Sequence, residues 1–145
     1  MNSKKQIGFE VKTLSNIIKR QFEEKARMKG LEGLTGMQGW IIAYLYKHGR
    51  DKEIFQRDVE REFNIRRSTA TGVLQLLERE GFITREAVAQ DARLKSLKLT
   101  DKAVRAQETI IKNIRELEEQ LAIGLTEEEI NTLFDLLNRI KKNTE

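Results

Sequence analysis

The apolar residues of this chain recur mostly at spacings of three and four, which is the period of an α-helix. These residues form four apolar stripes. The stripe in residues 35–48 covers much of the expected helix, which is typical of a largely buried element. The others are narrower, so those helices are expected to bury one face, and a second subunit is the simplest partner for that face. The four long segments with such stripes are residues 4–28, 35–48, 100–121 and 126–142.

Residues that cap helices stand at the expected starts of three of these segments. Thr35 with Gln38, and Thr126 with Glu129, have the spacing of a capping box, in which each side chain bonds a free backbone N–H of the first turn. Thr100 is expected to cap the helix that follows it. The caps therefore support the boundaries that the apolar stripes predict.

Residues 54–100 have a different organisation, which begins with two short helices at 55–63 and 67–80. Asn64 stands between them, and asparagine tolerates the left-handed backbone that a sharp helix–turn–helix corner often needs. Gly81 stands where the second helix ends and where the same conformation is wanted. The pattern therefore predicts a helix–turn–helix.

The second of these short helices has an unusual exposed face. Its inward face is apolar, whereas the opposite face presents short, uncharged hydrogen-bonding side chains with arginines at both ends. Gly72 lies on this face, at a cost of about 1 kcal/mol in helix propensity that close approach to a partner would justify. Such a helix fits the major groove of DNA. The same pattern also fits a plain surface helix.

A two-stranded hairpin is expected next, with strands at 82–87 and 96–99. The loop between them, residues 88–95, is polar and carries Arg93 and Lys95 near its tip. A basic hairpin beside such a helix is suited to the DNA minor groove or backbone. The hairpin therefore favours nucleic acid over the plain surface helix.

Charge is distributed unevenly along the chain, whose net charge is +4 and whose isoelectric point is about 9.4. Residues 66–98 carry seven basic and four acidic side chains, whereas residues 99–145 carry seven basic and ten acidic ones. The basic surplus thus includes the second short helix and the hairpin. A chain that holds polyanionic DNA is expected to have this polarity.

The sequence gives no support for enzyme or metal chemistry. Cysteine is absent and histidine occurs once, which argues against a zinc site. No phosphate-binding loop, nucleophile elbow or metal-spaced cluster is apparent, so we expect no enzyme activity, no catalytic residue, no metal and no cofactor. No apolar run reaches the length of a membrane span and no signal peptide opens the chain, so we expect a cytoplasmic protein without membrane contact.

A helix–turn–helix followed by LLEREGFI and then QDARLKSLKLTDKA resembles the MarR (multiple-antibiotic-resistance regulator) family of transcriptional regulators. The wing of that family carries a D-x-R pair before a strand that ends in L-T, and here these residues are Asp91, Arg93, Leu99 and Thr100. Length and helix order agree over nearly the whole chain. The resemblance implies a mainly α, winged helix–turn–helix fold, with six helices and a β-hairpin wing.

We expect a single domain over residues 1–145, in which residues 36–99 form the DNA-binding lobe. Residues 1–35 and 100–145 are expected to form a helical dimerisation region. The expected function is sequence-specific binding of double-stranded, pseudo-palindromic operator DNA by a homodimeric repressor that a small-molecule effector releases. A winged-helix module that binds another protein and not DNA remains the alternative.

Candidate DNA contacts follow from the exposed face of the second short helix and from the wing. Residues expected to enter the major groove are Arg66, Arg67, Ser68, Thr69, Thr71 and Gln75. Arg93 and Lys95 are expected to serve the wing, with Asp91 orienting Arg93. Gln56 and Arg57 are expected near phosphates.

The resemblance also implies an effector site. Members of this family often bind small aromatic or anionic ligands in a crevice between the dimer helices and the DNA-binding lobe. Trp40, Tyr44 and Phe22 could line such a crevice in this chain, but aromatics at helical spacing also fit a plain core. No ligand-binding residue is therefore assigned.

Overall fold

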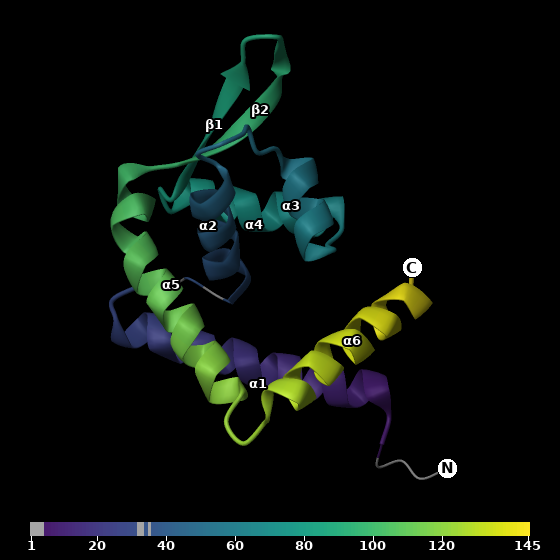
Figure 1. Cartoon of the computed structure of the whole chain (residues 1–145). Helices are drawn as coiled ribbons and strands as arrows, with labels where there is room; N and C mark the ends of the chain where they lie inside the picture. Colours follow the sequence, from purple (N-terminus) through teal and green to yellow (C-terminus); the bar gives the residue numbers. More distant parts are fainter. Residues whose placement is uncertain (1–4, 32–33, 35) are drawn as a thin grey trace. The chain divides into compact units, whose positions relative to one another are not determined.

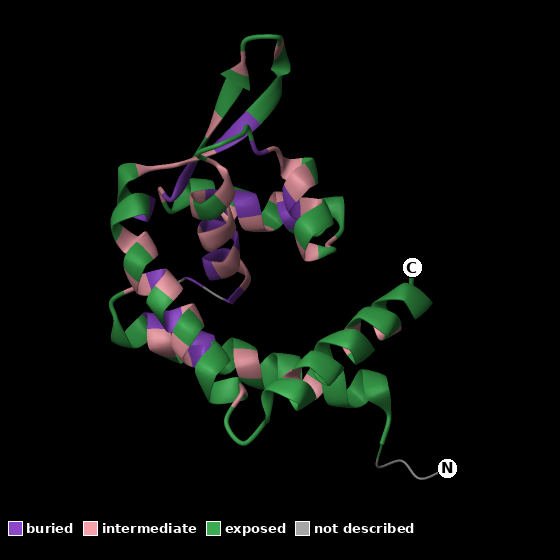
Figure 2. Cartoon of the chain, in the orientation of Figure 1, coloured by how far each residue is buried: buried purple, intermediate pink, exposed green. Residues whose placement is uncertain are grey.

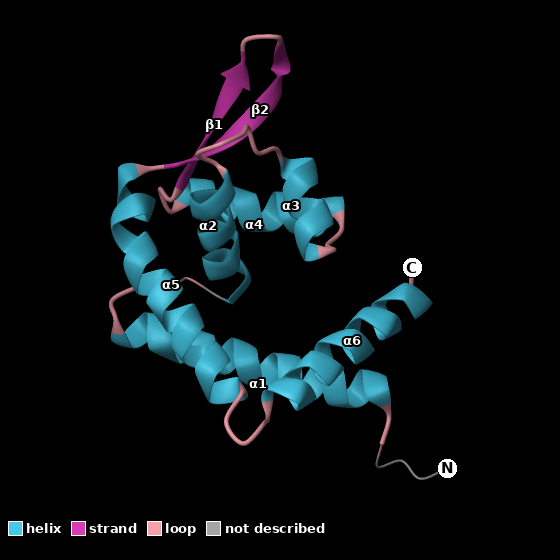
Figure 3. Ribbon diagram, in the orientation of Figure 1, coloured by secondary structure: helices cyan, strands magenta, loops and turns pink. Residues whose placement is uncertain are grey.

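The computed structural model describes residues 5–31, 34 and 36–145 of the chain. In these residues it has six helices and one antiparallel two-stranded hairpin, which confirms the predicted fold class (Figures 1 and 3). The elements are α1 (Ile7–Met28), α2 (Gly36–His48), α3 (Gln56–Phe63), α4 (Arg67–Arg79), β1 (Ile83–Val88), β2 (Asp91–Leu99), α5 (Asp101–Leu121) and α6 (Glu127–Asn143).

The chain forms two compact units, of which the first ends at Ile114 and the second comprises Arg115–Glu145. The predicted division into a DNA-binding lobe and a dimerisation region stays a prediction. None of the helices among the described residues combines the length and the apolarity that crossing a membrane requires.

The core of the first unit lies where α2, α4 and the base of the hairpin meet, with α3 packed on α4 (Figure 2). The apolar face predicted for α4 is buried here, except that Val73 is only half-buried. The buried hydrophobic residues of these elements are Ile41, Ile42, Leu45, Val59, Ala70, Leu74, Leu77, Ile83 and Leu97. This core holds α3, α4 and the hairpin in one rigid arrangement, because close-packed interiors deform little.

Most of the predicted helix ends are present. Asn64 has the left-handed φ of 49° between α3 and α4, and Gly81 follows α4 with a φ of 80°. Thr100 Oγ1 accepts a hydrogen bond from the Ala103 N–H at 3.2 Å and donates one to the Gly81 carbonyl oxygen at 2.6 Å. The bond to Gly81 ties the start of α5 to the end of α4.

The capping box of α6 is complete. Thr126 Oγ1 accepts from the Glu129 N–H at 3.1 Å, and Glu129 Oε1 accepts from the Thr126 N–H at 2.9 Å. The other predicted box falls on Thr35, which lies outside the described residues.

The predicted helix starts need two small corrections. α1 begins at Ile7, whereas a start at residue 4 was expected. α3 begins at Gln56, and Phe55 precedes it in extended conformation. The Asp58 carboxylate accepts the Phe55 N–H at 2.9 Å, which satisfies one of the free donors at this helix start and fixes the boundary.

The prediction of an eight-residue loop in the hairpin was wrong. β2 already begins at Asp91, so Arg93 and Lys95 lie on a strand and not at a loop tip. Val88 pairs with Asp91 and Ala87 with Lys95, so β2 accommodates Ala92, Arg93 and Leu94 in a bulge. The Asp91 carboxylate accepts the backbone N–H of Arg93 at 2.9 Å, and this local bond lets the chain continue as strand.

Candidate nucleic-acid interface

Helix α4 presents an exposed polar face on the surface of the first unit. Most of the residues predicted for the major groove are exposed there, and Thr71 is half-buried. The exposed ones are Arg66, Arg67, Ser68, Thr69 and Gln75. Gly72 lies among them, and a Cβ at this position would have nothing within 4 Å. The absence of a side chain at Gly72 therefore leaves room for a partner molecule to approach α4 closely.

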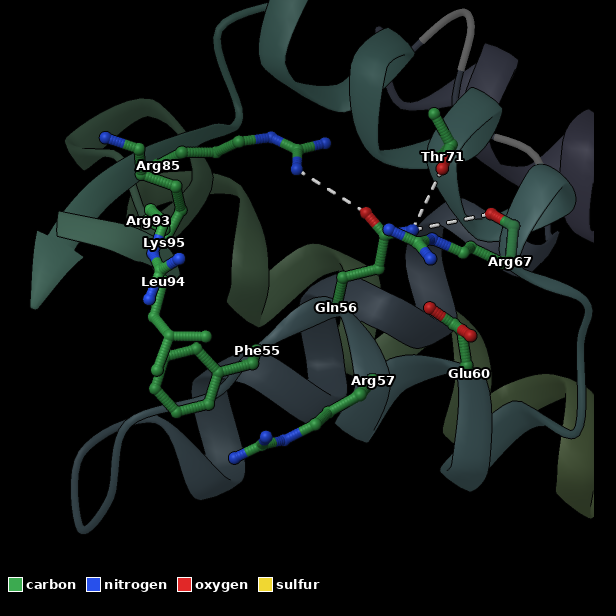
Figure 4. A pocket seen from close by; sticks show the side chains of 10 residues that line it. All are labelled: Phe55, Gln56, Arg57, Glu60, Arg67, Thr71, Arg85, Arg93, Leu94 and Lys95. Atoms are coloured by element: carbon green, nitrogen blue, oxygen red, sulfur yellow. Dashed lines mark hydrogen bonds between the residues drawn. The ribbon is translucent and has the colours of Figure 1, made fainter. Parts of the chain in front are cut away.

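A basic groove lies beside this face, where α3, the start of α4 and both strands meet (Figure 4). Its volume is about 420 Å³, and five of its lining residues are cationic while Glu60 is the one acid. The lining residues are Phe55, Gln56, Arg57, Glu60, Arg67, Thr71, Arg85, Arg93, Leu94 and Lys95. Such an open, positively charged groove attracts a polyanion.

Gln56 connects three elements at the floor of the groove. Its Nε2 donates to Thr71 Oγ1 at 2.9 Å and to the Arg67 carbonyl oxygen at 3.4 Å. Its Oε1 accepts from Arg85 Nη1 at 3.5 Å (Figure 4). Both ends of this amide are thus engaged within the chain, so α3, α4 and β1 are linked by one side chain.

Arg85 is a site residue that the sequence reasoning missed. Its side chain is 25% exposed, and its Nε lies 3.6 Å from Glu78 Oε1 on α4. The alternation of β1 could have found it, because every second residue of a strand points to the same face. Ile83 is buried in the core, and Arg85, two residues further along the strand, points to the same side, toward the helices.

Arg93 projects from the bulge of β2, and its side chain is 92% exposed. Asp91 Oδ1 lies 3.3 Å from Arg93 Nε, in addition to its bond with the Arg93 backbone. The structure therefore places Asp91 where it can orient Arg93. Lys95 is exposed on the same strand, and Arg57 lies over the Phe55 ring, with Cζ 5.2 Å from the ring centroid.

The base of the wing is anchored to the segment that precedes α3. The Leu97 N–H donates to the Ile54 carbonyl oxygen at 2.7 Å, and Lys98 Nζ lies 3.2 Å from Glu53 Oε2. Hydrogen bonds from Ser96 and then Lys98 hold the pKa of Glu53 below its ordinary value. These contacts fix the direction in which the hairpin leaves the core of the first unit.

The three aromatics considered for an effector crevice are engaged in packing. Phe22 is 2% exposed and lies against Gly39. Tyr44 makes an edge contact with the Phe63 ring at 5.9 Å between centroids. Burial, with smaller contributions from Asp58 and Glu62, raises the pKa of Tyr44. Trp40 is half-buried. These contacts are typical of a core and assign no ligand site.

Comparisons with known proteins agree with this geometry. A sequence model of the MarR family matches residues 32–94. The transcription regulator MarR from Oenococcus oeni PSU-1 is 36% identical, with 94% of this chain and 99% of that chain covered and a TM-score of 0.78. The S. aureus MepR–DNA complex is 25% identical, with 97% of each chain covered and a TM-score of 0.84.

A curated relative from Bacillus subtilis, the uncharacterized HTH-type transcriptional regulator YwhA, is 28% identical over 107 residues, which are 74% of this chain and 75% of that protein. The likeness to the Oenococcus oeni regulator extends over nearly the full length of both chains at more than 30% identity. The family predicted from the wing sequence is therefore confirmed, and the chain belongs to the MarR family of winged helix–turn–helix transcriptional regulators.

Proposed function

We propose that this regulator acts in the cytoplasm and binds double-stranded operator DNA as a homodimer, with α4 in the major groove and the hairpin as a wing. The observation that carries the proposal is the meeting of the exposed polar face of α4 with the basic groove. Arginine and lysine around such a groove neutralise phosphates, and short polar side chains on the helix reach base edges. The DNA complex of the similar MepR supports this assignment.

The two parts of the interface have different roles in this proposal. Arg66, Arg67, Ser68, Thr69, Thr71 and Gln75 supply the contacts in the major groove, where every base pair presents a distinct pattern. Arg93, oriented by Asp91, and Lys95 contact the minor groove or its phosphates. Arg57 lines the same groove from α3 and contacts a phosphate there in this proposal.

The homodimer is proposed from two apolar stripes that the single chain leaves exposed. On the first half of α1, the exposed apolar residues that share one face are Ile7, Val11, Leu14 and Ile17. On α6 they are Leu133, Phe134 and Leu136. Exposed apolar residues that recur along a helix in this way favour an association site, and a two-fold pair of copies covers them most simply.

For the effector, we propose only a chemical class. We propose a repressor that a small aromatic or anionic molecule releases. Such a molecule acts by binding the conformation that does not fit DNA more tightly than the one that does.

Selection of bound sequences from a random duplex pool tests the proposed function. Two recognition helices related by a two-fold axis are expected to select an inverted repeat with half-sites centred about 10 bp apart. Binding to the selected duplex is expected to weaken steeply with salt, because phosphate contacts release counterions. Weak, salt-insensitive binding with no enriched sequence would instead support the protein-binding module.

A further inference from the structure

The chain of hydrogen bonds through Gln56 has only one possible polarity. An arginine guanidinium donates hydrogen bonds and cannot accept them. Arg85 therefore faces the oxygen of the Gln56 amide, at 3.5 Å from Nη1. The amide nitrogen must then face the opposite side, where it lies 2.9 Å from Thr71 Oγ1 and 3.4 Å from the Arg67 carbonyl oxygen. The Arg67 carbonyl can only accept, which agrees with this orientation.

This polarity determines what the Thr71 hydroxyl can do. The Thr71 oxygen accepts a hydrogen bond from the Gln56 amide, so the hydroxyl hydrogen can be donated to a different acceptor. A helical threonine often donates that hydrogen to the carbonyl three or four residues earlier. Within the described residues, Thr71 makes no hydrogen bond to the Ser68 carbonyl, and the carbonyl four residues earlier is that of Arg67. That carbonyl already receives the helical N–H bond and the Gln56 amide, so its two acceptor sites are occupied.

We propose that Gln56 is a positioning residue which orients the Thr71 hydroxyl as a hydrogen-bond donor toward DNA. The proposal rests on the proposed function, because it names the specificity of one position within the same interface. Gln56 is half-buried at the floor of the groove and acts through Thr71 without reading a base itself. Arg85 acts one step further back, since it fixes the orientation of the Gln56 amide and is held by Glu78.

A Thr71 hydroxyl held as a donor should prefer certain bases at the position that it faces in the major groove. A donor in the major groove requires an acceptor, which guanine offers at N7 and O6, adenine at N7 and thymine at O4. Cytosine offers the amino group N4, which is a donor and leaves the hydroxyl unmatched. We therefore expect the selected half-site to contain one position, facing Thr71, at which cytosine on the contacted strand is disfavoured roughly three- to tenfold.

A double-mutant cycle tests whether Gln56 acts through Thr71. The ratio of affinities for the preferred base and for cytosine at this position is measured for the wild type and for Gln56→Ala, Thr71→Val and the double variant. Thr71→Val should abolish the preference, and Gln56→Ala should reduce it because the hydroxyl becomes free to rotate. The double variant should match Thr71→Val, whereas Thr71→Ser should retain the preference. Independent, additive losses would overturn the proposal.

The substitution Gln56→Glu is expected to reverse the direction of the hydrogen bond between residue 56 and the Thr71 hydroxyl. A carboxylate can accept from Arg85 and from the Thr71 hydroxyl together, so the hydroxyl hydrogen turns inward and only a lone pair faces DNA. The preference should then move toward a base that presents an amino group. Gln90→Glu makes the same chemical change in the exposed turn of the wing and should lower affinity without moving this preference. An unchanged preference in Gln56→Glu would overturn the proposal.

The failure of this inference is distinguishable from failure of the proposed function. If the wild-type protein selects no sequence at all, the proposed function fails. If it selects an operator, but the variants at Gln56 change only overall affinity, the function stands and the positioning role is wrong. Thermal unfolding of each variant, followed by far-ultraviolet circular dichroism, identifies any change that reflects loss of fold.

Discussion

The ring of Phe22 on α1 lies directly against the backbone of Gly39 on α2. A Cβ built at position 39 would be 2.6 Å from Phe22 Cε1 and 3.6 Å from Ile110 Cγ2 of α5. Phe22 is 2% exposed, so its ring is enclosed by neighbouring residues. Residues of α1, α2 and α5 thus meet at a position where an added Cβ would force the Phe22 ring to shift.

Gly39→Ala is expected to destabilise the protein, although alanine is the better helix former. Overpacking a close-packed core costs about 1–3 kcal/mol, whereas the gain in helix propensity is about 1 kcal/mol. Urea unfolding at neutral pH should therefore show a lower midpoint for the variant. An unchanged or higher midpoint would mean that the Phe22 ring moves aside easily.

Gly72→Ala is the matched substitution on α4, and the opposite result is expected for stability. A Cβ at position 72 meets nothing within 4 Å, so only the propensity gain of about 1 kcal/mol remains. Affinity for operator DNA should fall, because the added methyl group stands on the face that approaches the bases. Urea unfolding and binding isotherms measured on the same preparation check both effects. Full operator affinity in a stabilised variant would show that α4 does not approach DNA closely here.

Phe134→Asp should dissociate the homodimer without unfolding the chain. Phe134 is 56% exposed in the single chain, so the aspartate enters no core of its own subunit. In a dimer it would place an unpaired charge against an apolar partner surface. Sedimentation should give a monomer of 16.9 kDa, and far-ultraviolet circular dichroism should show wild-type helicity. Asn138→Asp, on an exposed position of the same helix, should leave the dimer intact.

The start of α6 should be sensitive to acid. The hydrogen bond from the Thr126 backbone N–H, followed by that from its side chain, lowers the pKa of Glu129. A carboxylate with a lowered folded-state pKa contributes stability above its ordinary pKa, and that contribution is lost as pH falls through the folded-state value. Glu129→Gln keeps an oxygen that accepts the Thr126 N–H but does not titrate.

Far-ultraviolet circular dichroism between neutral pH and about pH 3 tests this capping contribution. The wild type should lose more helicity on acidification than Glu129→Gln does, because only the wild type loses a negatively charged acceptor at this position. Glu128→Gln, at a neighbouring exposed position in the first turn, is the control for removal of one acid. Identical acid transitions in all three proteins would contradict the prediction.

Local chemistry made much of the fold readable from the sequence. Asn64, Gly81 and Thr100 mark helix ends because left-handed backbone and capping oxygens are properties of the residue itself. The apolar stripe of α4 predicted its buried face for the same reason, since a helix fixes which residues share a side. The wing sequence between Asp91 and Thr100 identified the family.

Features that depend on contacts across the fold were not readable. The bulge in β2 follows from the Asp91 bond to Arg93 together with the pairing of Ala87 and Lys95, and periodicity carries no sign of either. The groove arises only when α3, α4 and the hairpin are placed side by side. Strand alternation indicates the side to which Arg85 points, but its partners Gln56 and Glu78 come from two other elements and could not be predicted from the sequence of β1.

The two parts of the proposed interface should respond differently to substitution. Gln75 is exposed on α4, where a good bidentate base contact is worth about 1–3 kcal/mol of discrimination. Gln75→Ala should therefore relax the preference at one position of each half-site and leave the salt dependence unchanged. Isotherms on the selected operator and on its single-base variants check this. An unaltered base preference at every position would show that Gln75 does not contact a base.

The most direct test of DNA binding by α4 and the wing is the salt dependence of operator affinity for Arg93→Ala. Arg93 is almost fully exposed, so its loss should not disturb folding. Binding isotherms over a salt series should show lower affinity for nearly all sequences, with a slope smaller by about one unit because one cation–phosphate contact is gone. Affinity and slope equal to those of the wild type would contradict the account, because the wing would then make no contact with DNA.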